Sequence, residues 1–372
     1  MAGIYVHIPF CKKACNYCNF HFSISRNYRQ IIESILMEIE MNQKKISKKI
    51  ISTVYIGGGT PSIIDEKFIN QILKSIKSNY TISNDCEITI EANPDDINEK
   101  KLNSWKKSGI NRISLGVQSF NDLILKKLNR SHDSTLAISA IKKIQTQFTN
   151  YSIDLMFGTP DSNYSTVLND LKKIKEIFPP HISIYNMTVE ENTVMEKQLK
   201  KEKISLPNDN IIMSHFDQIH TFMNEIGYQN YEISSYCKDG FKSKHNSSYW
   251  MDKSYIGFGP GAHSYDKKFR YWNISDNDMY INKIKNSEKV FLKERLSKKN
   301  KINEYIITRI RTSTGINLEE LQNKFKINLY EKKNIEIDTM VKNMLLKKSN
   351  KKIKLTNEGK KVVDHITTKI MI

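Results

Sequence analysis

The sequence lacks a long hydrophobic run, because none of its apolar stretches approaches 18 consecutive residues. This absence excludes a helix that spans a membrane. The N-terminus also lacks the basic start and the apolar run of a signal peptide, so we expect a cytoplasmic protein. Wholesale disorder is excluded as well, since 39% of the 372 residues are apolar and 26% are charged, a balance that supports a folded core.

Arginine is scarce in a chain that is strongly basic. Only 8 of the 58 basic residues are Arg, and the formal net charge is +18. Lysine is spread along the whole chain and, with Asn and Ile, is abundant in the manner of proteins from AT-rich genomes. This pattern favours a solvated lysine-rich surface over a nucleic-acid-binding patch, although the charge can still attract anions such as carboxylates.

Cysteine is also scarce, and its number is odd. Five Cys in a cytoplasmic chain argue against a disulfide framework. Two of them, Cys86 and Cys237, stand alone, and we expect them to be small core residues. The other three, Cys11, Cys15 and Cys18, fall within eight residues, which makes them the first candidate for a functional site.

Short β-branched runs alternate with amphipathic segments in the first half of the chain. Such alternation predicts a parallel sheet, and six units predict an α/β fold with a partial (β/α) barrel, in which function gathers at the C-terminal ends of the strands. The expected strands are Ile4–Ile8, Thr53–Ile56, Glu87–Ala92, Arg112–Val117, Ser152–Met156 and His181–Tyr185. The expected helices are Tyr28–Met41, Glu66–Ser78, Asn98–Lys107, Ser134–Gln147 and Asn163–Ile177.

The second half of the chain predicts a helix at Asn208–Ile226 and a further strand at Tyr228–Ser235. We therefore expect a barrel over residues 1–235, a connecting region over 236–299 and a small helical domain over 300–372. A winged-helix-like arrangement of this last domain is an alternative. Its expected helices are Asn303–Thr312, Leu318–Lys326 and Lys361–Ile370, the last one preceded by Thr356 as a cap.

The three clustered cysteines lie in a short loop directly after the first expected strand. Three thiolates on such a loop can ligate three irons of a 4Fe–4S cluster and leave the fourth iron open to a small molecule with amino and carboxylate groups. The alternatives are a zinc site or three core thiols. Zinc normally takes four ligands in two pairs, and no second pair of cysteines exists here.

Glycine-rich or polar segments follow the other expected strands. Each segment taken singly is more often a turn than a site. Five of them around one barrel mouth are hard to explain as turns only, and they predict a ligand site. The segments are Gly57–Pro61, Glu91–Pro94, Gly116–Phe120, Leu128–Arg130 and Asp154–Pro160.

The CxxxCxxC spacing of Cys11, Cys15 and Cys18 resembles the radical S-adenosylmethionine (SAM) superfamily. Together with the strand-end segments it resembles the oxygen-independent coproporphyrinogen III oxidase family over essentially the full length. This resemblance implies a 4Fe–4S cluster on the three cysteines and SAM at its open iron. The positions that the resemblance implies for SAM contacts are Tyr5, Tyr17, Gly58, Gly59, Thr60, Glu91, Gln118, Arg130 and Asp154.

Two of these positions are implied for a second SAM molecule and not for the SAM on the cluster. Arg130 and Asp154 match positions that serve a second SAM in the true oxidase.

At Gly59, a side chain would intrude where the backbone must approach SAM. We therefore expect Gly59→Val to weaken SAM binding and to leave the cluster intact.

Two departures from the oxidase pattern point to a branch of the family. The oxidase has a fourth cysteine two residues after the third, where this chain has Phe20. The oxidase also has an N-terminal extension before its first strand, whereas the first strand expected here begins at about Ile4. Both departures resemble the heme chaperone branch, HemW.

The segment His245-Asn246-Ser-Ser-Tyr249-Trp250 matches the HNxxYW motif of that branch. A histidine imidazole can ligate heme iron, and the resemblance implies this role for His245. In a helix Tyr249 would share a face with it, and Trp250 could stack on a porphyrin. The alternative is a hydrogen-bonded histidine in an aromatic cluster. The glycine-rich segment Tyr255–Tyr265 also resembles the family and could line the porphyrin.

The resemblance implies a heme chaperone that carries a 4Fe–4S cluster, SAM and heme. Its partners would be an acceptor apo-hemoprotein of the respiratory chain and a second copy of the chain. One alternative is an oxidase that uses SAM radical chemistry on coproporphyrinogen. The other is a nucleic-acid binder that uses the basic C-terminal domain. Only the charge and a vaguely winged-helix-like tail support it, so we expect no nucleic acid.

Overall fold

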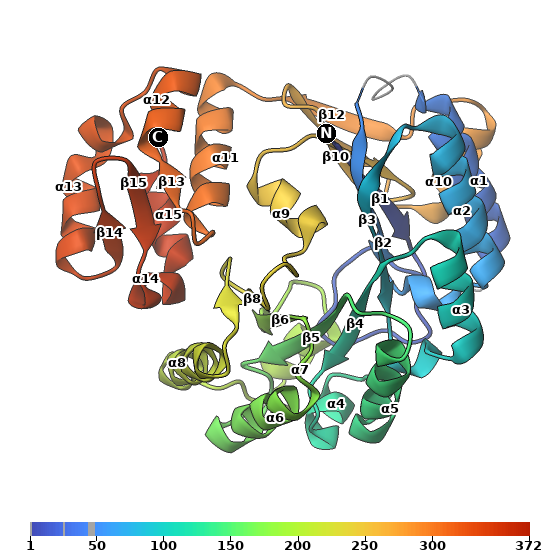
Figure 1. The fold of residues 1–372 in the computed structure, drawn as a ribbon, viewed down its shortest axis with the longest axis horizontal. Coiled ribbons are helices and arrows are strands. Elements are labelled where there is room, and N and C mark those ends of the chain that lie inside the picture. Colours follow the sequence, from blue (N-terminus) through green and yellow to red (C-terminus); the bar gives the residue numbers. More distant parts are fainter. Residues whose placement is uncertain (1, 25–26, 44–48) are drawn as a thin grey trace.

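The fold is built on a curved sheet with helices on its outer face (Figure 1), as a computed structural model of residues 2–24, 27–43 and 49–372 shows. Six parallel strands form its centre, and they confirm the predicted α/β class. These strands are β1 (Ala2–Ile8), β2 (Ile51–Gly58), β3 (Ile82–Ala92), β4 (Arg112–Gln118), β5 (Tyr151–Phe157) and β6 (His181–Asn186).

Each of the first five strands is followed by at least one helix that packs on the sheet. All five helices predicted for this half are present, and the structure adds the short helix α4. Asparagine and aspartate side chains cap most of these helices by accepting backbone N–H groups of the first turn. The helices are α1 (Tyr28–Met41), α2 (Glu66–Asn79), α3 (Glu99–Ser108), α4 (Asp122–Lys127), α5 (Ser134–Gln145) and α6 (Tyr164–Ile177).

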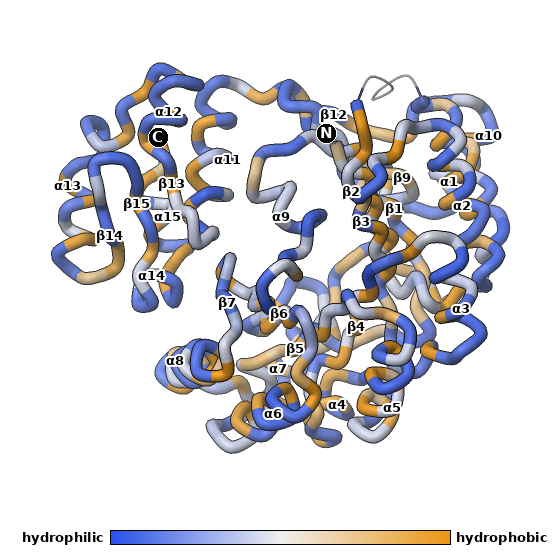
Figure 2. Tube along the Cα trace, in the orientation of Figure 1, coloured by the Kyte–Doolittle hydropathy of each residue, from blue (hydrophilic) through white to orange (hydrophobic). Residues whose placement is uncertain are grey.

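The parallel strands are apolar on both faces because both faces are buried. Helices cover the outer face, and the inner face is turned into the barrel interior. In β1, for example, six of the seven residues are buried. Figure 2 shows the hydrophobic segments concentrated along β1 to β5, with hydrophilic segments in the outer loops. Polar side chains appear on the inner face near the strand ends, where they are available for a site.

Shorter strands extend the sheet at both edges. The strand order is β12-β11-β10-β9-β1-β2-β3-β4-β5-β6-β8-β7, and only β9 continues the parallel set beside β1. The sheet therefore ends at β12 and β7, so the barrel is partial, as predicted. The edge strands are β7 (Gln229–Asn230), β8 (Ser235–Cys237), β9 (Tyr255–Phe258), β10 (His263–Tyr265), β11 (Phe269–Asn273) and β12 (Phe291–Arg295).

The strand predicted at Tyr228–Ser235 is wrong. The chain turns back there, so that β7 and β8 form an antiparallel pair. The turn is fixed locally, because the Asn230 amide donates to the carbonyl oxygen of Glu232 at 2.6 Å and the Ser234 N–H donates to the Glu232 carboxylate at 3.2 Å.

The helices of the middle region include the one that carries the HNxxYW motif. This helix, α9 (Lys244–Trp250), lies between the sheet and the C-terminal part of the chain (Figure 1). None of the helices in the described ranges has the length and apolar character needed to cross a membrane. The other helices of this region are α7 (Val194–Lys200), α8 (Asp209–Glu225) and α10 (Asn277–Lys285).

The C-terminal unit, from α11 to α15, has a hydrophobic core of its own. It is helical as predicted. Thr356 accepts the N–H of Gly359 and so caps the short helix Asn357–Lys361, whereas the predicted cap of the last helix is wrong, because Val363–Ile370 begins after Val362 without a side-chain cap. A three-stranded antiparallel sheet lies among the helices, and none of its strands was among the expected elements. The helices are α11 (Lys298–Ile310), α12 (Leu318–Phe325), α13 (Leu329–Lys342), α14 (Asn357–Lys361) and α15 (Val363–Ile370), and the strands are β13 (Ile316–Asn317), β14 (Leu346–Lys348) and β15 (Lys352–Leu355).

Candidate functional site

The cysteine loop follows β1 and is anchored to the segment after α4. The Asn16 amide donates to the carbonyl oxygen of Lys127 at 2.8 Å, and the Asn16 N–H donates to that of Leu128 at 3.2 Å. In the opposite direction, the Asn129 amide donates to the carbonyl oxygen of Ala14 at 2.6 Å. The segment after α4 thus provides a fixed backbone against which the cysteine loop folds.

The three thiols of Cys11, Cys15 and Cys18 line one wall of a cavity of about 430 Å³ at the C-terminal ends of the strands. The Thr60 hydroxyl donates to Sγ of Cys11 at 3.4 Å, and the Arg130 guanidinium donates to Sγ of Cys15 at 3.3 Å. Burial raises the pKa of Cys11 to about 11, while Thr60 and Arg130 act in the opposite direction. Both donors therefore favour the thiolate, which is the form that binds iron.

The arrangement of these thiols suits a cluster better than a single ion. In the part of the chain that the structure describes, no three His, Cys, Asp or Glu side chains are grouped to hold one metal ion. In a 4Fe–4S cluster, by contrast, each thiolate binds a different iron. The remaining cysteines, Cys86 and Cys237, are buried elsewhere, as expected, so three thiols are what this cavity offers.

The glycine turn after β2 supports the cysteine loop directly. Gly58 has a φ of +118°, a conformation that L side chains rarely adopt. A Cβ on Gly59 would lie 2.6 Å from the carbonyl oxygen of Phe10 and 3.0 Å from Sγ of Cys11. The expectation that a side chain at Gly59 would affect SAM alone is therefore wrong, because it would first displace the cysteine loop.

Glu91 is the acidic group of the cavity wall next to this turn. Its carboxylate accepts the Tyr55 hydroxyl at 2.7 Å and the Gly58 N–H at 3.1 Å. Burial raises the pKa of Glu91 to about 7, and these two hydrogen bonds oppose the shift. The carboxylate can accept hydrogen bonds from a ligand in the cavity, but only while it is ionised.

Most of the other positions predicted for SAM also line the cavity. Tyr17, Gln118, Arg130 and Asp154 do so together with the glycine turn. Arg130 spans the cavity wall, because it also donates to the carbonyl oxygen of Gly116 at 2.9 Å. The structure therefore brings together residues from the cysteine loop and from the ends of four different strands.

Tyr5 is the one predicted position that lies outside the cavity lining. Its hydroxyl is 3.1 Å from Nδ1 of His7, and its ring stacks against Tyr55 with centroids 6.2 Å apart. Tyr5 therefore supports Tyr55 from behind, and of these two residues it is Tyr55 that lines the cavity.

The motif histidine on α9 is enclosed. His245 is 1% exposed, and its ring stacks on Tyr55 with centroids 4.9 Å apart. Its Nδ1 lies 2.8 Å from the Thr53 hydroxyl and its Nε2 lies 2.8 Å from the Tyr249 hydroxyl. Burial lowers the pKa of His245 to about 3, so the ring is neutral. Both ring nitrogens are thus occupied, which matches the aromatic-cluster alternative in this conformation.

The two faces of α9 contribute to two different cavities. Asn246 lines the cavity of the three cysteines. Tyr249 and Trp250 line a second cavity of about 220 Å³, together with Tyr255 and Tyr265 from the glycine-rich segment. His245 lies between the two groups on the same helix.

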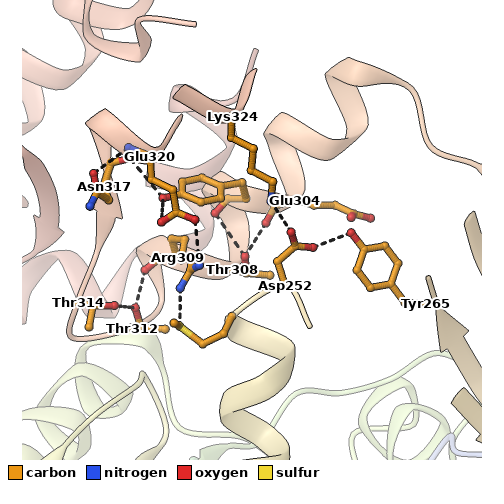
Figure 3. Close-up of polar contacts among 12 residues, drawn as sticks. Asp252, Tyr265, Glu304, Thr308, Arg309, Thr312, Thr314, Asn317, Glu320 and Lys324 are labelled. Atoms are coloured by element: carbon orange, nitrogen blue, oxygen red, sulfur yellow. Dashed lines mark hydrogen bonds and ion pairs between the residues drawn. The ribbon is translucent and has the colours of Figure 1, made fainter. Parts of the chain in front are cut away.

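Both ends of α9 are held by contacts from distant parts of the chain. At its start, the N–H groups of Lys244 and His245 donate to the Glu87 carboxylate at 3.0 and 2.8 Å. Just past its end, Asp252 accepts hydrogen bonds from Tyr265 and Lys324, as Figure 3 shows. Lys324 belongs to α12, so the C-terminal unit fixes one end of the helix and β3 fixes the other.

Several residues of the site were not predicted from the sequence. The Tyr55 hydroxyl donates a hydrogen bond to Glu91, and the Tyr55 ring stacks on His245. The Glu87 carboxylate accepts a backbone N–H at the start of α9. Arg112 also lines the main cavity. These residues could have been found from the alternation along β2, β3 and β4. Every second side chain of a barrel strand faces the interior, and the polar ones at these positions are candidates for the site. Phe20, at the place of the oxidase's fourth cysteine, is 69% exposed.

Comparisons with known proteins agree with this geometry. Residues 5–174 match the model of the radical SAM superfamily, and residues 296–361 match that of the HemN C-terminal domain. The chain is 31% identical to the heme chaperone HemW of Lactococcus lactis, over 99% of this chain and 97% of the relative. It is 30% identical to the heme chaperone HemW of Bacillus subtilis, over 97% of this chain and 96% of the relative.

A solved structure shares the fold over the whole chain. The coproporphyrinogen III oxidase (HemN) of Escherichia coli aligns with a TM-score of 0.87 and covers 100% of this chain and 90% of its own. Sequence identity is 21%, so this likeness concerns the fold.

Proposed function

Because this chain belongs to the heme chaperone HemW family within the radical SAM superfamily, we propose that it binds heme and passes it to an acceptor apoprotein. The acceptor is a hemoprotein of the respiratory chain. The observation that carries the proposal is the position of α9, which bears the HNxxYW motif. Asn246 of this helix lines the same cavity as the three cysteines, while Tyr249 and Trp250 line the second cavity.

The main cavity would hold a 4Fe–4S cluster and SAM. Cys11, Cys15 and Cys18 would hold the cluster through their thiolates, and the cluster would supply an iron with an open position for SAM. Thr60 and Arg130 donate to the sulfur atoms and so favour their ionised form. Glu91 and Gln118 supply polar groups to SAM from the ends of β3 and β4.

His245 is proposed as the axial ligand of the heme iron. Nε2 of a neutral imidazole can donate its lone pair to iron, and the low pKa of His245 keeps the ring neutral. Ligation requires that the Tyr249 hydroxyl first leave Nε2, because the two atoms are 2.8 Å apart. Because both residues lie on α9, we infer that the Tyr249 side chain must rotate away from His245 before heme binds.

A transfer assay tests the proposed function. The protein, reconstituted anaerobically with iron and sulfide, is loaded with heme and mixed with an apo-hemoprotein whose holo spectrum is distinct. We expect the acceptor spectrum to appear at a rate above that of free heme. A parallel anaerobic assay with coproporphyrinogen should give no protoporphyrinogen. Product formation there, with no heme transfer, would favour the oxidase instead.

The family resemblance also leads us to propose a homodimer that depends on the cluster. Light scattering of reconstituted and iron-free protein measures this directly. We expect twice the chain mass only in the reconstituted sample. A monomer in both samples would contradict the proposal.

A further inference from the structure

One buried charge in the barrel interior has no part in the cluster, SAM or heme assignments above. Arg112 is the first residue of β4, and its side chain is turned inward and is only 2% exposed. A guanidinium stays charged at any accessible pH, and a fully buried one is normally paired with an anion. The groups that face Arg112 therefore determine whether a further ligand is required.

Most of this guanidinium has no hydrogen-bond partner among the described residues. One Nη atom donates to the Asn150 amide oxygen at 2.9 Å, which is a neutral acceptor. Nε is buried and has no hydrogen-bond partner among the described residues. Within those residues no carboxylate lies within ion-pair distance of Arg112 either. A buried cation in this state is costly unless an anion from outside the chain completes the site.

Asp154 is a carboxylate near Arg112, and it already accepts hydrogen bonds from serine hydroxyls. Asp154 accepts the Ser114 hydroxyl at 3.0 Å and the Ser152 hydroxyl at 3.3 Å. The other titratable neighbour is His181, whose ring nitrogens lie 2.7 Å from the hydroxyls of Ser152 and Tyr231. Burial and the positive charge of Arg112 lower the pKa of His181, which keeps it neutral. Neither group cancels the charge of Arg112 at close range.

Arg112 lies on the same cavity wall as groups that can donate hydrogen bonds. The lining of the main cavity includes Arg112 and, from the start of α9, Ser243 and Asn246. Hydroxyl and amide donors around an arginine are the ordinary means by which proteins bind a carboxylate. Asn246 belongs to the heme motif, so this end of the cavity adjoins the helix that the proposed function assigns to heme.

We propose that the inner end of the main cavity is a carboxylate-binding subsite centred on Arg112. The Ser243 hydroxyl and the Asn246 side-chain amide add hydrogen bonds to the bound carboxylate. The assignment of this carboxylate to a propionate of heme rests on the proposed function. A free small carboxylate has the same chemistry, and the experiment below separates the two sources.

Iron-free porphyrins test the subsite independently of axial ligation. Protoporphyrin IX carries two carboxylates, and its dimethyl ester has the same ring without them. Both are titrated against reconstituted wild type, Arg112→Gln and Arg112→Lys, with the change in porphyrin absorption as the signal. We expect wild type to bind the free acid about tenfold or more tightly than the ester, as a charge-assisted pair allows. Arg112→Gln should reduce this ratio to below twofold, and Arg112→Lys should restore part of it.

Each outcome decides the proposal. An unchanged acid-to-ester ratio in Arg112→Gln, or no preference in wild type, overturns the subsite. If Arg112→Gln does not fold, Asn246→Ala replaces it, and a ratio lowered about threefold supports the site while an unchanged ratio overturns it. If neither porphyrin binds, the proposed function fails. Calorimetry with succinate then decides: binding that requires Arg112 supports a small-carboxylate site, and no binding overturns it.

Discussion

The phenol oxygen of Tyr249 lies 2.8 Å from Nε2 of His245, one turn earlier on the same helix. The nitrogen that a heme iron would need is therefore occupied by a hydroxyl from the same motif. The other ring nitrogen lies 2.8 Å from the Thr53 hydroxyl on β2. Heme binding at His245 thus competes with a hydrogen bond inside the motif, and this competition can be measured.

Removal of the Tyr249 hydroxyl should favour heme binding. Tyr249→Phe keeps the aromatic ring in the second cavity and removes only the group on Nε2. A hydrogen bond of this kind contributes about 1 kcal/mol, so we expect heme to bind about fivefold more tightly. Titration of the reconstituted variant with heme, followed in the Soret region, measures the change.

A matched control exists for this substitution. His181 is also buried, and its Nε2 lies 2.7 Å from the Tyr231 hydroxyl. Tyr231→Phe removes the corresponding bond at a histidine that we do not assign to heme, so heme affinity should stay within twofold of wild type. Weaker heme binding by Tyr249→Phe would contradict the proposed competition between the Tyr249 hydroxyl and heme for Nε2 of His245.

The cluster assignment predicts unequal effects of two cysteine substitutions. Cys15→Ala removes a thiol that lines the main cavity and contacts Arg130. Cys86→Ala removes a thiol that is buried on β3 outside that cavity. After anaerobic reconstitution, Cys15→Ala should lose most of its bound iron and Cys86→Ala should keep it. Equal iron loss in the two variants would show that the loop does not hold the cluster.

The glycine turn predicts a coupled loss of iron and SAM. In Gly59→Ala the new Cβ would lie 2.6 Å from the carbonyl oxygen of Phe10, so the cysteine loop must shift. Both the iron content and the affinity for SAM should fall. Gly240→Ala is the control, because its Cβ would meet nothing within 4 Å, although Gly240, unlike Gly59, has a positive φ of +82°. A Gly59→Ala protein with full iron and weak SAM binding would restore the simpler view that this turn serves SAM alone.

Glu91 predicts a pH dependence of SAM binding. Its pKa is raised to about 7 by burial, so the carboxylate is ionised above pH 7 and becomes protonated as the pH falls below it. A protonated Glu91 loses acceptor capacity, and SAM affinity should weaken from pH 8 to pH 6. In Glu91→Gln the affinity should be about tenfold lower at pH 8, as hydrogen bonds to charged groups suggest. The ratio of wild-type to variant affinity should shrink toward pH 6, and a ratio independent of pH would contradict the role of Glu91.

The main sheet and the main cavity could be predicted from the sequence because both follow local rules. Buried parallel strands are continuous apolar runs, and their C-terminal ends meet at one edge, so polar residues there fall into one site. Cys11, Glu91 and Arg130 were placed together on that basis, and the structure brings them to one cavity. The strands of the C-terminal unit are only two to four residues long. This is too short to show the alternation of apolar and polar residues by which a strand is predicted.

The surroundings of His245 could not be predicted from the sequence. Its Nδ1 partner, Thr53, is 192 positions away in the chain, and Glu87, which accepts its backbone N–H, is 158 positions away. Such contacts depend on how α9 is placed across the barrel by the sheet and the C-terminal unit. Tyr249 was expected on the same helix face, but a motif match alone did not reveal that its hydroxyl would bond the ring of His245.

Heme binding by a pair of matched histidine variants tests the proposed function most directly. His245 and His181 are both buried, and each has a hydroxyl near both ring nitrogens, so replacement by Ala should have similar effects on folding. The measurement is the Soret spectrum and the heme stoichiometry of wild type, His245→Ala and His181→Ala after anaerobic reconstitution. We expect His245→Ala to shift the Soret band or to lose heme while it keeps its iron–sulfur content, and His181→Ala to match wild type. An unaltered spectrum and stoichiometry in His245→Ala would contradict the assignment of heme to the α9 motif.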